Sequence, residues 1–225
     1  MSRFRLCLAV VAALLAFAVV AGLAQQRASA QPDRASVVVA CPGSERWTIK
    51  TLTDPAAGSV DYAHPVTKTV AELAAQDPAP EHIGSSTPRL PLEKIVYRVK
   101  VHLVKAKIEQ SGEKGDEDIH LVIADPSPPE DPVGQTMIAE FPKPDCAPES
   151  GSKKAAQMQK ARAAFVAACG TPPKGTPRDF LRTATATITG VGFFDLKHGT
   201  PQLGRAPHDR ELHPVLRFVI TSRCR

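Results

Sequence analysis

Apolar and polar residues alternate along residues 95–103, and a period of two is typical of a half-buried β-strand. The apolar positions are Ile95, Tyr97, Val99, Val101 and Leu103. His102 shares the other face with Arg98 and Lys100, so we expect a solvated histidine. The acidic residues 109–118 follow, with Gly112 and Gly115 among them, and predict a solvated hairpin turn.

Shorter strands and one helix follow along the chain. Strands are predicted over residues 119–123, 136–141, 183–189 and 216–220. A helix is predicted over residues 152–168, where Met158, Ala161 and Phe165 share a face and Gly170 stands at the C-terminal cap.

The predicted elements come in the order of an OB-fold. Three strands, a helix and two strands build this small five-stranded Greek-key barrel, with the helix between strands three and four. We therefore expect a mainly β (α+β) protein with an OB-like barrel domain over residues 93–225. A different mixed sheet with one helix is the alternative, because other α+β folds share this order.

Residues 31–92 are expected to form an N-terminal extension and a Pro-rich linker. Residues 47–49 predict a short strand. Val70 and Leu73 lie at helical spacing, and Thr69 with Glu72 three residues later predicts a capping box. The prolines of the linker are Pro78, Pro80, Pro88 and Pro91.

Residues 1–30 have the pattern of a secretory signal peptide. Arg3 and Arg5 precede an apolar run over residues 6–24, and Ala28-Ser29-Ala30 matches a small-residue cleavage site. A single-pass anchor is the alternative, but the polar residues before the cleavage site argue against it. We expect an exported protein, periplasmic or extracellular, with no membrane span after signal cleavage.

Removing the signal weakens the apparent basicity of the chain. The formal net charge of +5 includes three arginines of residues 1–30, so 25 basic residues remain against 23 acidic ones, which leaves +2. Nonspecific nucleic-acid binding needs a dense basic surface, so nucleic acid is not an expected partner. The expected partner is an unidentified ligand or an envelope protein, and the expected state is a monomer.

The cysteine count agrees with export. Cys7 lies in the signal, and an even set remains: Cys41, Cys146, Cys169 and Cys224. These allow two disulfides in three connectivities, and no C-x-x-C spacing points to zinc or redox chemistry. We favour Cys146–Cys169, which brackets the predicted helix, with Cys41–Cys224 joining the chain ends; the other connectivities stay open.

The candidate site residues are histidines and carboxylates in the second half of the chain. Strand alternation places Asp118 with His120, and Glu211 with His213, on the face opposite the regular apolar positions. Imidazoles and carboxylates are therefore predicted to converge on one exposed face of the barrel. The candidate cluster consists of His120, Asp195, His198, Glu211 and His213.

Three stretches of the chain resemble an uncharacterised family of exported bacterial proteins. They read D-E-D-I-H-L-V-I, G-V-G-F-F-D-L-K-H-G and A-P-H-D-R-E-L-H-P-V, and the resemblance spans residues 41–219. The family more often has Asn-Gly where this chain has His208-Asp209. The resemblance implies export and implies no activity.

Two functions from different classes follow. The first is a noncatalytic OB-like module that binds a ligand or protein at the cell envelope, with the cluster holding loop and barrel together by hydrogen bonds. The alternative is a metal-dependent hydrolase, because histidine and carboxylate are ligands for divalent ions that activate water. No cofactor is required by the first function, and catalytic residues are not assigned. In the first case Glu211→Ala should destabilise the fold by roughly 1–3 kcal/mol.

Overall fold

The computed structural model describes residues 46–112, 115–127, 135–146, 151–196, 203–204 and 207–224. The elements before the barrel are α2 (Trp47–Lys50), η1 (Ala57–Ser59), β1 (Asp61–Thr67), α3 (Val70–Ala74) and η2 (Pro91–Lys94). The elements that follow are β2 (Ile95–Ile108), β3 (Ser111–Gly112), β4 (Gly115–Asp116), β5 (Ile119–Ala124), β6 (Met137–Phe141), α5 (Ala155–Cys169), β7 (Arg178–Asp179), β8 (Thr185–Phe194), η3 (Pro207–Asp209) and β9 (Arg210–Ile220).

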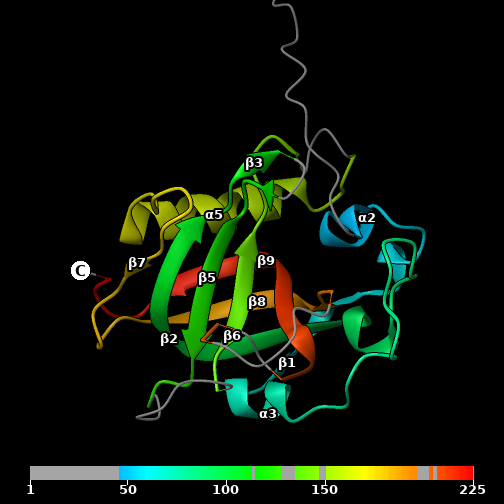
Figure 1. The fold of residues 1–225 in the computed structure, drawn as a ribbon, viewed down its shortest axis with the longest axis horizontal. Coiled ribbons are helices and arrows are strands. Elements are labelled where there is room, and N and C mark those ends of the chain that lie inside the picture. The colour runs from blue at the N-terminus through cyan, green and yellow to red at the C-terminus, as the bar shows by residue number, and fades with distance from the viewer. Residues whose placement is uncertain are drawn as a thin grey trace, which may run out of the picture. The chain divides into compact units, whose positions relative to one another are not determined.

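Five strands close into a barrel (Figure 1). Neighbours follow the order β2, β5, β6, β9, β8, and β8 pairs back with β2. The β6–β9 pair is parallel and the other pairs of the ring are antiparallel. With α5 between the third and fourth strands of the ring, this confirms the predicted OB-like barrel.

β2 bends so that one strand serves two sides of the barrel. It pairs with β8 from Val96 to His102 and with β5 from His102 to Ile108. The register with β5 shifts between Leu103 and Lys105, so the buried positions change phase along the strand. Such a bulge increases the local twist, which closing a small barrel requires.

Helices lie at both ends of the barrel (Figure 1). Phe165 of α5 is fully buried and packs against Phe141 and Phe218, with ring centroids 5.1 and 5.4 Å away. Val70 and Leu73 of α3 belong to the same core. The barrel interior is therefore filled by side chains from both helices and all five strands.

The predicted capping box at the start of α3 is confirmed. Thr69 Oγ1 accepts from the Glu72 amide at 3.0 Å, and the Glu72 carboxylate accepts from the Thr69 amide at 2.8 Å. Asp125, directly after β5, adds two further contacts by accepting from the amides of Val70 and Ala71. This short helix is thus held to the barrel at its N-terminus.

The strand predicted at residues 47–49 is wrong, because these residues form the helix α2. The Thr51 hydroxyl donates to the Trp47 carbonyl at 2.9 Å, which closes the helical turn. Arg46 precedes the helix and donates to both oxygens of Glu93, at 2.5 and 2.7 Å. This buried pair fixes α2 to the start of the barrel.

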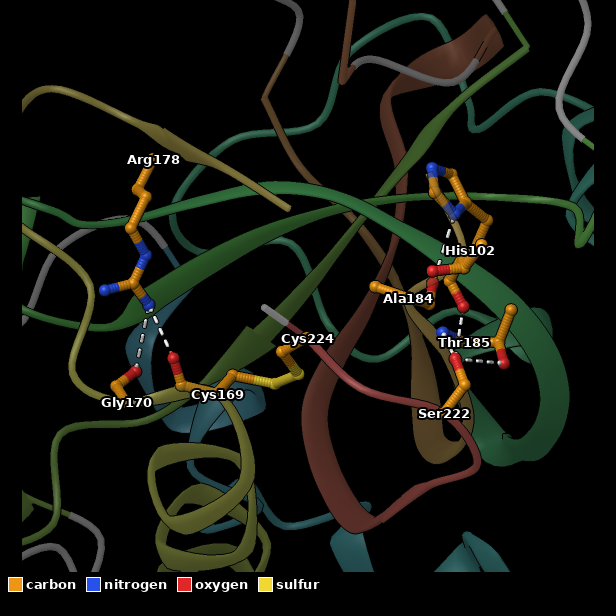
Figure 2. Close-up of a disulfide and its surroundings, with 9 residues drawn as sticks. His102, Cys169, Gly170, Arg178, Ala184, Thr185, Ser222 and Cys224 are labelled. Carbon is orange, nitrogen blue, oxygen red and sulfur yellow. Dashed lines mark hydrogen bonds between the residues drawn. A yellow bond between two sulfur atoms is a disulfide. The ribbon is translucent and has the colours of Figure 1, made fainter. Parts of the chain in front are cut away.

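The favoured disulfide pairing is wrong. Cys169, at the end of α5, is bonded to Cys224, and their Cα atoms lie 5.1 Å apart (Figure 2). Both Cys146–Cys169 and Cys41–Cys224 are therefore excluded. α5 lies along β9, so its last residue meets the chain that follows β9 rather than the chain that precedes α5. Cys146 is also disulfide-bonded, and Cys41 lies outside the described residues.

His102 is buried, which corrects the expectation of a solvated side chain. It is 6% exposed, and its Nδ1 lies 3.1 Å from the Ala184 carbonyl oxygen (Figure 2). Arg98 and Lys100 on the same strand are exposed. The phase change of β2 begins at this point, so His102 turns toward the segment that leads into β8.

Candidate functional site

Polar residues from three neighbouring strands meet on the outer wall of the barrel. His120 of β5 lies opposite Glu140 of β6, and β9 runs parallel to β6 on its other side. His213 of β9 therefore approaches Glu140 from the opposite direction to His120. The sheet topology, and not sequence spacing, brings these side chains together.

Glu140 joins the two histidines. Its Oε1 accepts a hydrogen bond from His120 Nδ1 at 2.8 Å, and its Oε2 lies 2.8 Å from His213 Nδ1. Glu140 is not among the residues predicted from the sequence. The available signal was a single carboxylate within the otherwise apolar strand M-I-A-E-F.

Asp118 lies on the far side of the His213 ring. Its Oδ2 is 3.4 Å from His213 Nε2, and its Oδ1 accepts from the Lys143 amide at 2.6 Å. Burial and the nearby Asp116 raise the pKa of Asp118 to about 7. Burial lowers the pKa of His213, but the carboxylates of Asp118 and Glu140 outweigh it and raise this pKa to about 9.

Lys50 of α2 covers the cluster. Its Nζ is 3.3 Å from Asp116 Oδ2 and 5.8 Å from the centre of the Phe193 ring, which itself packs against His213. Burial alone would lower the pKa of Lys50, but Glu140, Asp116 and other carboxylates raise it well above its usual value. Lys50 is therefore a buried cation among acids.

The prediction that the cluster lies on an exposed face is wrong for Asp118, Glu211 and His213, whereas His120 and Asp195 are partly exposed. Asp118 and His213 are 0% exposed, Glu140 is 4% exposed and Glu211 is 7% exposed. The extension supplies the cover, because Arg46 and Lys50 lie over the Phe193 ring beside His213. No local pattern in the sequence links residues this far apart.

Of the remaining predicted residues, Glu211 and Asp195 lie beside this centre. Glu211 pairs with Phe193 in the β8–β9 ladder, and Phe193 stands two residues before Asp195. The Asp195 amide donates to the Asp209 carbonyl at 2.9 Å. Burial, followed by the negative charges of Asp195 and Glu140, raises the pKa of Glu211 well above its usual value. His198 lies outside the described residues.

The cluster reaches solvent on the β5 side. The side chains of His120 and Glu109 are 23% and 25% exposed, and Glu109 Oε1 lies 3.4 Å from His120 Nδ1. Lys107 Nζ contacts the same Glu109 oxygen at 3.0 Å. His120 is thus at the boundary between the buried centre and water.

The expectation of a fully solvated acidic turn also needs correction. Asp116 and Asp118 are buried, while Glu117 pairs with Lys143 and, at 2.6 Å, with Lys174. Hydrogen bonds from Lys143 and Lys174 lower the pKa of Glu117 to about 2. The end of the turn therefore belongs to the cluster.

A cavity of about 490 Å³ lies at a second place, beside the chain that leaves β8 and enters β9. It is lined by residues 78–84 of the Pro-rich segment and by Asp195, Leu196, His208 and Asp209. His208 and Asp209 have positive φ angles of 68° and 52°. Non-glycine residues in this conformation are strained and are enriched at functional sites.

No protein-family model matches the chain, and neither the curated proteins nor the solved structures gave a match. None of the helices in the described part of the chain has the length and hydropathy that a bilayer crossing requires.

Proposed function

We propose that the protein is an exported, noncatalytic OB-like module that binds a ligand at the cell envelope. The observation that carries this proposal is the cavity between the Pro-rich segment and the β8–β9 connection. The loop between the fourth and fifth strands of an OB-fold is one of the two loops that usually flank its ligand. The volume of the cavity lies in the range of small-molecule sites.

The lining of the cavity favours a ligand with a positively charged group. The lining includes the acidic residues Glu81, Asp195 and Asp209 and two histidines, and no lysine or arginine is among the described residues that line it. Pro78, Ile83 and Leu196 supply apolar surface. A phosphate backbone would be repelled here, whereas a basic peptide or a polyamine would be attracted.

Catalysis has less support. A hydrolase needs its substrate and water to reach the reacting groups, and His213 and Asp118 have no exposed surface. His120 is the accessible histidine of the cluster, but its Nδ1 is engaged by Glu140. The metal-dependent hydrolase therefore stays the alternative function.

Export is supported by the Cys169–Cys224 disulfide. Disulfides persist in oxidising compartments and are rare in a reducing cytoplasm. The signal-like residues 1–30 lie outside the described residues, so signal cleavage is part of the proposal.

Calorimetric titration of the purified, exported protein tests the ligand class. The probes are spermidine, a Lys-Lys dipeptide, a neutral oligosaccharide and a short oligonucleotide. We expect the cationic probes to bind and Asp209→Asn to weaken binding about tenfold, the equivalent of about 1.4 kcal/mol. Asp179→Asn, an exposed acid on β7, is the matched control and should bind like wild type.

Binding of the oligonucleotide but not of spermidine would overturn the ligand class. Hydrolysis of an ester or phosphodiester that is lost in His120→Ala would overturn the noncatalytic assignment in favour of the hydrolase.

A further inference from the structure

The outward side of β2, β8 and β9 carries a polar and basic surface. These strands lie side by side in the barrel wall, with β8 between the other two (Figure 1). The strand register aligns their outward residues in two rows. We define the basic sheet face by these rows, which consist of Arg98, Thr189 and Arg217 in one and of Lys100, Thr187 and Val219 in the next.

Burial alternates along the three strands, which shows that the basic sheet face points away from the core. The residues between its members in the sequence, such as Val99 and Ile188, belong to the barrel core. The three cations of the face and Val219 are exposed, and Thr187 is partly exposed. The cations are therefore available to a partner in solution.

The extension and α5 cover the outer side of these strands only as far as the neighbouring row. Val96 and Val191 are paired in that row, and they are buried in a cluster with Met158 of α5 and with Leu52 and Val60 of the extension. The side chains of the next two rows are basic or polar, apart from Val219. Within the described part of the chain, no segment packs over their cations.

The cations of the basic sheet face have no carboxylate partner among the described residues. The ion pairs found there involve other lysines and arginines, namely Arg46, Lys50, Lys68, Arg89, Lys107, Lys143 and Lys174. Neighbouring strands are about 4.8 Å apart, so the cations of β2 and the cation of β9 are separated by about 10 Å. An uncompensated group of cations attracts a molecule with several negative charges.

The residue types of the face favour an acidic polysaccharide over a nucleic acid. Proteins that bind single-stranded nucleic acids combine a basic groove with aromatic side chains on which the bases stack. No aromatic residue is among the six that define the face. Its arginines match a carboxylate with paired donors, and the threonine hydroxyls between the cations can both donate to and accept from sugar hydroxyls.

We propose that the basic sheet face binds an acidic polysaccharide, whose carboxylates pair with Arg98, Lys100 and Arg217. The proposed cavity ligand carries the opposite charge, because acidic residues line the cavity. Binding at the sheet face therefore does not depend on the cavity, and either proposal can fail without the other.

The test is calorimetric titration of the exported protein with an oligogalacturonate, a neutral malto-oligosaccharide of the same length and an oligothymidylate. We expect the oligogalacturonate to bind, to bind more weakly as the salt concentration rises, and to bind more tightly than the other two probes. Arg98→Gln/Arg217→Gln should weaken this binding about tenfold, since each exposed pair contributes up to about 1 kcal/mol.

A matched double variant separates a local effect from a change in net charge. Lys107→Gln/Lys174→Gln removes the same charge from two lysines that already pair with Glu109 and Glu117, and it should bind like wild type. Lys100→Gln alone should weaken binding about two- to fivefold, which keeps the test decisive if the double arginine variant fails to fold.

Three results would overturn the proposal. They are the absence of oligogalacturonate binding by wild type, equal weakening in the two double variants, and tighter binding of oligothymidylate than of oligogalacturonate.

Discussion

Gly192 shows at the scale of a single residue why the G-V-G-F-F stretch contains a glycine. A Cβ atom added there would lie 2.7 Å from the Leu92 carbonyl oxygen and 2.8 Å from Tyr97 Cε2. The glycine therefore allows η2 and β2 to pack directly on β8. This stretch serves close packing in the barrel wall.

Gly192→Ala is expected to lower the free energy of unfolding by about 1–3 kcal/mol, because a backbone oxygen must move to admit the methyl group. Urea unfolding measures the change. Gly58→Ala is the control, since nothing lies within 4 Å of its added Cβ. A Gly192→Ala variant as stable as Gly58→Ala would contradict the packing argument.

The burial of His102 predicts how the stability of the fold depends on pH. Burial lowers the pKa of His102 below the usual value of 6.5, against a smaller opposing effect of the Ala184 carbonyl, and the charge of Arg182 lowers it further. The unfolded chain therefore takes up a proton more readily than the folded protein. The stabilisation is present above pH 6.5 and is lost as the pH falls through the folded-state pKa.

The expected result is that wild type loses more stability between pH 7 and pH 5 than His102→Asn, which keeps a hydrogen-bond donor near Ala184. Unfolding curves across this range measure the difference. His82→Gln, an exposed histidine, should follow wild type. Parallel pH curves for wild type and His102→Asn would show that burial of this imidazole does not govern the acid response.

At the scale of elements, α2 covers a face of the barrel wall that would otherwise be exposed to solvent. It has only four residues, so helix formation by itself contributes little. Arg46 holds it in place, because its guanidinium donates to Glu93 and to the Phe194 carbonyl at 2.8 Å. Arg89 adds a second buried pair with Asp54 at 2.6 Å.

Arg46→Met should lower the free energy of unfolding by about 3–5 kcal/mol, because it leaves the Glu93 carboxylate buried without its partner. Chemical denaturation measures the loss. Lys68→Met breaks a partly exposed pair with Glu72 and should cost less than about 1 kcal/mol. Similar losses in both variants would argue against a special role of the buried pair.

At the scale of the whole molecule, the disulfide ties the end of α5 to the C-terminal segment. The bonded residues are 55 apart in the chain, so the bond restricts a long loop in the unfolded state. Replacing both Cys169 and Cys224 with serine is expected to cost about 4 kcal/mol in the loop-entropy model. Thermal and urea unfolding of the double variant check this value, and an unchanged midpoint would contradict it.

The same bond predicts the remaining connectivity. Once Cys169 is paired with Cys224, the three arrangements open to four cysteines reduce to the one that joins Cys41 with Cys146. Peptide mapping of the exported protein under non-reducing conditions should recover this linkage. Recovery of Cys41 as an alkylated thiol would show the prediction to be wrong.

The sequence alone determined the elements of the barrel, because this information is local. The period-two alternation of β2, the apolar runs of β5 and β6 and the helix before Gly170 each show which face of an element is buried, and their order favours an OB-like ring. The pairing of β8 with β2, which closes the ring, came only from the tertiary structure. The capping box at Thr69 is equally local, since both partners lie within one turn.

Only the tertiary structure decided what covers the cluster and which cysteines meet. Lys50 and Asp116 are 66 residues apart, and no periodicity relates a side chain to a partner at that distance. Glu140 joins His120 to His213 because β6 lies between β5 and β9 in space, although β9 comes last in sequence. Alternation correctly predicted which residues share a face of their strand. It could not predict whether that face is buried, because burial depends on which other parts of the chain pack over it.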